Sequence, residues 1–270
     1  MNANKALWEK GDFTKIAETM RDSGTELIGK IGINSNHKVL DLGCGDGTTA
    51  IPAARLGADV LGVDIARNLV KAGNARAALE NLDNCKFQEG DACQLGELAD
   101  NSFDRVISIF GAMFAPEPQN VAKEMVRVAR PGGQVVMGNW IPNDPTLVAQ
   151  ILKTCSAYAP PPPKGFISPM TWGVQESVTE RFVSAGIEEE NISFIEDTFT
   201  FSASISPSKF SKRFLQYYGP TMNALEAAAQ AGKAADLEQE LEDLFNTHNK
   251  STVTDAMLIP ATFLRVTVSV

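Results

Sequence analysis

The sequence has few of the side chains that most often bind metals. Its 270 residues include two histidines, His37 and His248, and four cysteines, none of them in a CxxC pair. Because structural zinc sites are built from closely spaced cysteine and histidine ligands, the sequence predicts no metal site. Cysteines of this kind are typical of free, reduced thiols, and we therefore expect a cytoplasmic protein.

Positive charge and long apolar runs are also scarce. Lys and Arg total 24 against 33 Asp and Glu, which gives a formal net charge of −9. An acidic surface repels the phosphates of nucleic acids and anionic membranes, so neither is an expected partner. The N-terminal residues lack the apolar core of a signal peptide, and no apolar run reaches the roughly 18 residues that a membrane span needs.

The most informative stretch is residues 39–49, where an apolar run leads into three glycines at alternate positions. It reads Val-Leu-Asp-Leu-Gly-Cys-Gly-Asp-Gly-Thr-Thr and contains Gly43, Gly45 and Gly47. This pattern is typical of a buried strand, a tight turn and the start of a helix. The glycines would let backbone N–H groups and the helix N-terminus approach a ligand, and Asp41 would accept hydrogen bonds from a cationic or hydroxyl group. The spacing fits neither the GxxxxGK[ST] phosphate loop nor the GxGxxG dinucleotide motif.

Strand and helix patterns alternate from residue 39 to residue 140. Strands are predicted at 39–42, 59–64, 85–88, 103–109 and 134–140, and helices at 48–56, 66–81 and 118–129. Such alternation predicts parallel strands joined by right-handed crossovers.

The pattern changes in the second half of the chain. Four prolines at 160–163 predict an extended linker, and a helix is predicted near 171–185. Period-two alternation over 192–202 and 262–270 predicts two antiparallel strands, with a helical insertion over 207–248 between them.

Acidic residues follow two further predicted strands. Asp64 closes the strand at 59–64, where it would lie beside the glycine turn and accept both hydroxyls of a ribose. This feature alone does not separate a nicotinamide cofactor from S-adenosylmethionine. Asp91 lies in a Gly-Asp-Ala triplet after the next strand.

Together, the motifs over residues 39–140 resemble those of the S-adenosylmethionine-dependent methyltransferases with a Rossmann-like, seven-stranded fold. The sequence is most similar in character to the ubiquinone- and menaquinone-biosynthesis type. The resemblance implies S-adenosylmethionine as the cofactor, with Asp91 accepting the adenine amine and the N–H of Ala92 donating to the ring. The residues expected to contact the cofactor are Asp41, Gly43, Cys44, Gly45, Asp64, Ile65, Asp91, Ala92 and Ile109.

The predicted fold is one α/β domain over residues 1–270. It has a doubly wound, mostly parallel seven-stranded sheet with an antiparallel last strand and a helical cap. Its expected parts are an N-terminal helical lid at 1–36, a cofactor-binding half at 37–142, a linker, helix and sixth strand at 143–206, a helical cap insertion at 207–252 and the last strand at 261–270. In similar proteins the N-terminal segment covers the cofactor, so Trp8 and Phe13 either cover the ligand or only fasten the helix to the domain.

The expected activity is methylation of an oxygen, carbon or nitrogen atom of a small apolar or aromatic molecule. Aromatic residues that could line its site, or only pack the cap, are Phe114, Phe166, Trp172, Phe210, Phe214, Tyr217 and Tyr218. Neither His37 nor His248 is assigned as a catalytic base, and the catalytic residues and oligomeric state stay open. The alternatives are an NAD-dependent reductase, which the glycine spacing and antiparallel tail disfavour, and a non-catalytic S-adenosylmethionine-binding protein.

Overall fold

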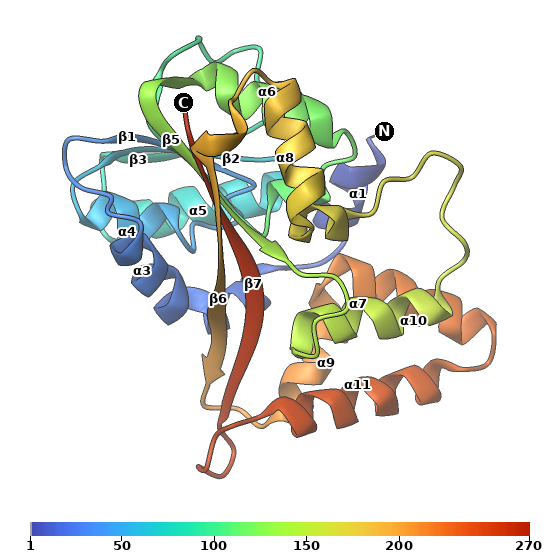
Figure 1. The fold of residues 1–270 in the computed structure, drawn as a ribbon. Helices are drawn as coiled ribbons and strands as arrows, with labels where there is room; N and C mark the ends of the chain where they lie inside the picture. The colour runs from blue at the N-terminus through green and yellow to red at the C-terminus, as the bar shows by residue number, and fades with distance from the viewer. Residues whose placement is uncertain (1) are drawn as a thin grey trace.

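A seven-stranded sheet forms the centre of the computed structural model, which describes residues 2–270 (Figure 1). The strands are β1 (Lys38–Leu42), β2 (Asp59–Asp64), β3 (Cys85–Glu89), β4 (Phe103–Ile109), β5 (Ala129–Trp140), β6 (Ile192–Ala203) and β7 (Met257–Ser269). Their order across the sheet is β3-β2-β1-β4-β5-β7-β6. Strand β7 is antiparallel to both of its neighbours, and the other neighbouring pairs are parallel. The predicted sheet is therefore confirmed, although β7 begins at Met257 rather than at residue 261.

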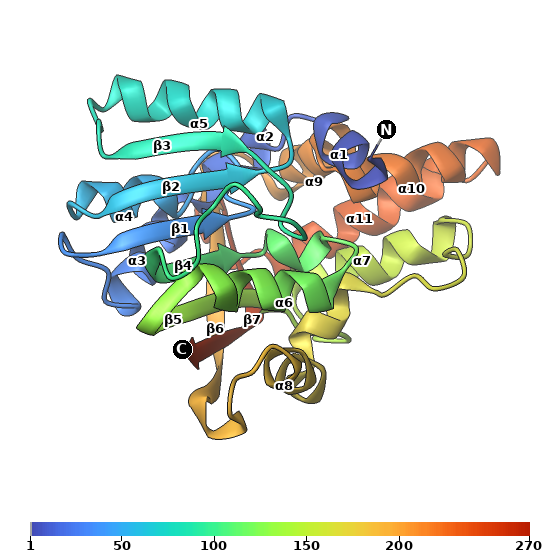
Figure 2. The same cartoon turned by 90° about the horizontal axis from the view of Figure 1, so that it is seen from above.

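Helices cover both faces of the sheet. Helices α3 (Arg21–Lys30), α4 (Ala50–Arg55) and α5 (Arg67–Leu79) lie on one face, and α6 (Pro118–Val128) and α8 (Gln175–Ser184) lie on the other (Figures 1 and 2). Helix α6 shows how the sequence directs this packing, because Val121, Met125 and Val128 share one helical face and are fully buried. Each such side chain contributes roughly 1.5–3 kcal/mol through burial.

A second group of helices lies beyond the carboxyl ends of the parallel strands (Figure 2). It consists of α7 (Leu147–Tyr158), α9 (Pro207–Tyr217), α10 (Gly219–Gln230) and α11 (Ala234–His248), which pack on one another. We call these four helices the cap. Helix α7 was not predicted, and it adds a helix from the linker segment to the expected insertion. Within residues 2–270, no helix combines the length and apolar character required to cross a lipid bilayer.

The N-terminal segment contacts both the cap and the sheet. It contains α1 (Ala3–Glu9), α2 (Thr14–Ala17), the 3-10 helix η1 (Glu18–Met20) and α3. Helix α1 lies so close to the start of α10 that a Cβ at Gly219 would be 2.6 Å from the Leu7 carbonyl oxygen. At the other end of the segment, Ser23 on α3 binds the edge strand β6. Its Oγ donates to the Thr200 carbonyl and accepts from the Thr200 N–H, each at 2.9 Å.

Candidate functional site

The glycine turn after β1 is built by positions that only glycine fills without strain. Gly43, Gly45 and Gly47 all have positive φ angles, at 69°, 56° and 89°. The end of β4 also passes in direct contact with this turn. A Cβ at Gly43 would be 2.7 Å from the Gly111 Cα, and a Cβ at Gly111 would be 2.2 Å from the Gly43 carbonyl oxygen. The turn therefore presents bare backbone at the carboxyl ends of β1 and β4, as predicted.

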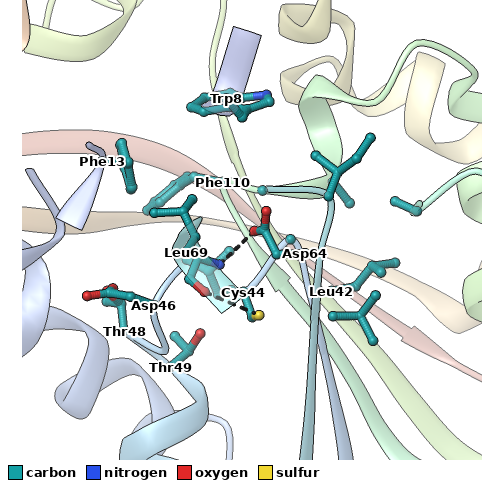
Figure 3. A pocket seen from close by; sticks show the side chains of 18 of the residues that line it. Trp8, Phe13, Leu42, Cys44, Asp46, Thr48, Thr49, Asp64, Leu69 and Phe110 are labelled. Atoms are coloured by element: carbon teal, nitrogen blue, oxygen red, sulfur yellow. Dashed lines mark hydrogen bonds between the residues drawn. The ribbon is translucent and has the colours of Figure 1, made fainter. Parts of the chain in front are cut away.

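Asp64, at the end of β2, fixes this turn from the neighbouring strand. Its Oδ2 accepts a hydrogen bond from the Gly45 N–H at 2.8 Å (Figure 3). Its Oδ1 accepts one from the Ala66 N–H at 2.9 Å. Burial raises the pKa of Asp64, and the backbone hydrogen bonds oppose that rise. Since a carboxylate can accept about four hydrogen bonds, both oxygens retain capacity for the hydroxyl groups of a ligand.

A cavity lies over the glycine turn, and we call it the glycine cavity. It encloses about 900 Å³, part of it open to solvent. Eight of the nine predicted cofactor contacts line it: Gly43, Cys44, Gly45, Asp64, Ile65, Asp91, Ala92 and Ile109. The bare backbone and the Asp64 carboxylate fit a nucleoside-containing cofactor.

Asp41 is the predicted contact that does not line the glycine cavity. Its side chain is buried behind the turn, where Oδ2 accepts a hydrogen bond from the Thr49 hydroxyl at 2.6 Å. The other oxygen, Oδ1, has no hydrogen-bond partner among the described residues. Burial raises the pKa of Asp41 to about 7, the hydrogen bond from Thr49 opposing that rise. Asp41 therefore does not line the cavity in this geometry, because its carboxyl group accepts a hydrogen bond from Thr49 just before α4.

Asp46 holds the turn from its outer side, a role that the sequence did not reveal. Arg21 on α3 donates two hydrogen bonds to the Asp46 carboxylate, at 3.0 and 2.5 Å, and one to the Thr48 hydroxyl at 2.9 Å. Arg76 on α5 donates to the Asp46 carbonyl at 2.5 Å. Two helices thus position the turn through Asp46: α3 through its almost fully buried carboxylate and α5 through its backbone carbonyl.

The N-terminal segment closes the cavity near the end of β3. Asn2 Nδ2 donates to Asp91 Oδ2 at 3.1 Å, while Asp91 Oδ1 accepts from the Cys93 N–H at 2.9 Å. Lys5 pairs with Glu89, and Glu9 accepts a hydrogen bond from the Arg67 N–H at 3.1 Å. The first helix is therefore held to the part of the sheet where the predicted adenine contacts lie.

A second, smaller hollow of about 340 Å³ adjoins the glycine cavity, and we call it the aromatic chamber. Its lining residues are Trp8, Phe13, Ile16, Met20, Phe110, Phe114, Trp140, Val148, Phe201, Phe214 and Tyr218. Four of them, Trp8, Phe13, Met20 and Phe110, also line the glycine cavity. Figure 3 shows Trp8, Phe13 and Phe110 on the side of that cavity away from Asp46 and Thr49. Trp8 and Phe13 thus line the cavity, and their covering of a bound ligand stays a prediction.

Phe110 lines both hollows and has an unusual backbone conformation. It has a φ of 61°, which is rare for a bulky residue, and its ring stacks on Trp140 with centroids 3.7 Å apart. The stack fixes the Phe110 side chain at the end of β4, beside the predicted contact Ile109. Strain of this kind often marks functional positions.

The predicted aromatic set is only partly correct. Phe114, Phe214 and Tyr218 line the chamber, and Phe210 packs behind Phe214 with ring centroids 5.1 Å apart. Tyr217 lies outside the lining. Trp172 instead packs between Phe182 and Arg181 beside α8, and Phe166 is 56% exposed in the loop after the prolines.

Among the described residues, neither histidine lies at the site. His37 precedes β1, at the opposite end of the strand from the glycine turn, and His248 ends α11; neither lines the two hollows. Among the described residues, Tyr218 is the only titratable group that lines the chamber. Its burial raises the pKa of the phenol, so it remains neutral at physiological pH.

Comparison with known proteins agrees with this geometry. Residues 40–137 match a family described as a methyltransferase domain. The uncharacterized protein Rv1403c of Mycobacterium tuberculosis is 32% identical over 246 residues, covering 89% of this chain and 86% of the relative. Sterol 4-C-methyltransferase strm-1 of Caenorhabditis elegans is 32% identical over 129 residues, or 47% of this chain and 38% of that protein. A Haemonchus contortus phosphoethanolamine N-methyltransferase 2 shares the fold, with a TM-score of 0.60 at 17% identity, covering 100% of this chain and 60% of that chain.

The sheet order, the glycine turn and the adjoining cavity define a Rossmann-like methyltransferase fold. The chain belongs to the S-adenosylmethionine-dependent methyltransferases. It is an enzyme, and its cofactor is S-adenosylmethionine, which supplies a methyl group carried on a positively charged sulfur.

Proposed function

We propose that the enzyme methylates an apolar small molecule that occupies the aromatic chamber. The observation that carries this proposal is that Trp8, Phe13, Met20 and Phe110 line both hollows, so that the hollows adjoin. A molecule in the chamber would therefore lie next to one in the glycine cavity, as an in-line transfer requires. The lining is almost wholly aliphatic and aromatic, which suits an apolar acceptor.

The cofactor contacts form part of the same proposal. Asp64 would accept the ribose hydroxyls, and Asp91 with the Ala92 N–H would bind the adenine. The backbone of Gly43 and Gly45 would lie along the methionine part. Cys44, Ile65 and Ile109 would complete the wall around it. The exclusion of water by α1 and by the aromatic wall would favour a reaction in which charge moves from sulfur to the acceptor.

The relatives support an acceptor of this class without identifying it. The name of strm-1 indicates that this relative methylates a sterol, which is a large apolar molecule. The aromatic chamber is narrow, about 340 Å³ with its open side counted, so a small or slender acceptor fits best.

The experiment that tests the proposal is a labelling assay with methyl-labelled S-adenosylmethionine and cell extract. After incubation, the extract is separated into small molecules, protein and nucleic acid, and products are identified by mass spectrometry. We expect label in an apolar small molecule, with a strong reduction for the Asp64→Ala control. Label confined to protein or nucleic acid would contradict the proposed acceptor class. Tight cofactor binding with no labelled product would instead favour the non-catalytic alternative.

A further inference from the structure

Three aromatic rings meet where the glycine cavity joins the aromatic chamber. The rings of Trp8, Phe13 and Tyr218 form a triangle with centroid separations of 6.0, 5.8 and 6.1 Å. Their planes are inclined to one another by 90°, 59° and 45°. Phe114 lies against Trp8, with centroids 5.1 Å apart. The rings come from α1, the segment before α2, and the junction of α9 and α10, so the lid and the cap build the group together.

The electrostatic character of this group favours positive charge. Among the described residues that line the aromatic chamber, none carries a formal charge at neutral pH. Aromatic faces are the negative part of the ring quadrupole and attract a cation within about 6 Å of the centroid. An anion in the chamber would face these rings without a lining cation to balance it. A group that becomes positive during the reaction would be stabilised there.

The lack of a base in the chamber restricts the acceptor further. A hydroxyl nucleophile must lose a proton during attack, and a methylated alkene must lose one afterwards, so both need a base. An amine does not, because its nitrogen attacks with a lone pair and burial lowers the pKa of a bound amine toward the neutral form. The nitrogen forms the bond to the methyl carbon, the carbon–sulfur bond breaks, and its electron pair stays on sulfur. The positive charge moves to nitrogen, and a secondary amine releases its extra proton to water after the product leaves.

We propose that the acceptor is an apolar secondary or tertiary amine, and that Trp8, Phe13 and Tyr218 form an aromatic cage for the developing ammonium. This inference rests on the proposed function, since it names the class of the apolar acceptor. Tyr218 lines the chamber, and its hydroxyl can accept a hydrogen bond from the N–H of a secondary amine.

The test measures cation preference directly and needs no knowledge of the natural acceptor. Phenyltrimethylammonium and its neutral isostere tert-butylbenzene are each titrated with the full chain saturated with S-adenosylhomocysteine, and benzoate is the anionic comparison. We expect the cation to bind roughly tenfold or more tightly than the isostere. Trp8→Leu and Phe13→Leu should bring the ratio of the two affinities, cation over neutral isostere, toward one. Trp8→Phe should retain part of the preference for the cation. Phe166→Leu, in the exposed loop, is the matched control and should not change it.

The wild-type ratio decides the proposal even where a variant fails to fold. A ratio near one, or tighter binding of benzoate than of the cation, would overturn the cage. If a labelled apolar product is found but the cation is not preferred, this inference fails while the proposed function stands. If the labelling assay finds no small-molecule product, the proposed function itself fails.

Discussion

The pairing of Arg21 with Asp46 should determine how firmly the glycine turn is held. Arg21→Met removes a guanidinium group that makes two hydrogen bonds to Asp46, at 3.0 and 2.5 Å, and leaves that carboxylate buried. Breaking one partner of a buried pair costs about 3–5 kcal/mol. The cost here should be lower, about 2–3 kcal/mol, because the Arg21 side chain is 24% exposed and Arg76 stays 3.8 Å from Asp46.

A double-mutant cycle separates this interaction from general damage to the fold. The free energy of unfolding in urea is measured for Arg21→Met, Asp46→Asn and the double variant. We expect a coupling energy of about 2 kcal/mol, together with roughly tenfold weaker binding of S-adenosylhomocysteine by each single variant. Lys30→Met is the matched control, since Lys30 lies on the same helix and forms a more exposed pair with Asp197. Its effect should stay below about 1 kcal/mol. A coupling energy under about 0.5 kcal/mol would refute the role assigned to the Arg21–Asp46 pair.

Three further predictions concern carboxylates of the site. Burial raises the pKa of Asp41 to about 7, so the native state binds the Asp41 proton more tightly than the unfolded state does. The contribution of protonated Asp41 to the free energy of unfolding should therefore be lost as pH rises from about 4 to 7. Asp41→Asn should therefore become more stable relative to wild type over that window, by up to about 4 kcal/mol in urea unfolding; a constant difference would contradict this. Asp64→Ala should weaken S-adenosylhomocysteine binding at least roughly tenfold by calorimetry, since each charge-assisted hydrogen bond is worth about 1.5–3 kcal/mol. Asp91→Asn should weaken S-adenosylhomocysteine more than an analogue without the adenine amine, and equal losses would show that Asp91 does not bind that group.

The sequence predicts the cofactor half well because its signals are local. The strands at 59–64 and 103–109 have the predicted bounds, since each is a short apolar run flanked by polar or turn residues. The glycine turn is equally local, because its three positive φ angles are required by consecutive positions of one turn. The acceptor type, the ubiquinone-like subfamily and the cytoplasmic location stay predictions.

The features that were missed depend on residues far apart in the chain. Helix α7 is stabilised by packing on α10 and α11. The aromatic chamber, for which the sequence offered Phe114, Phe214 and Tyr218 as candidates, also draws on α1, two strands and other parts of the cap. The contact of Arg21 with Asp46 spans 25 positions. The sequence predicted Asp41 as a cofactor contact because nothing in the neighbouring residues indicates that its carboxylate is buried. Its hydrogen bond with Thr49 depends on how α4 packs against β1.

The hydrogen bonds between Ser23 and Thr200 link the integrity of the active site to the solubility of the protein. Strand β6 forms one edge of the sheet, and the unpaired backbone of an edge strand can pair with a strand of another molecule. The Ser23 hydroxyl occupies both backbone groups of Thr200 as a neighbouring strand would. Because the same N-terminal segment carries Trp8 and Phe13, its release would uncover the cofactor and the sheet edge together. Loss of catalysis and a tendency to self-associate would then arise from one local unfolding event.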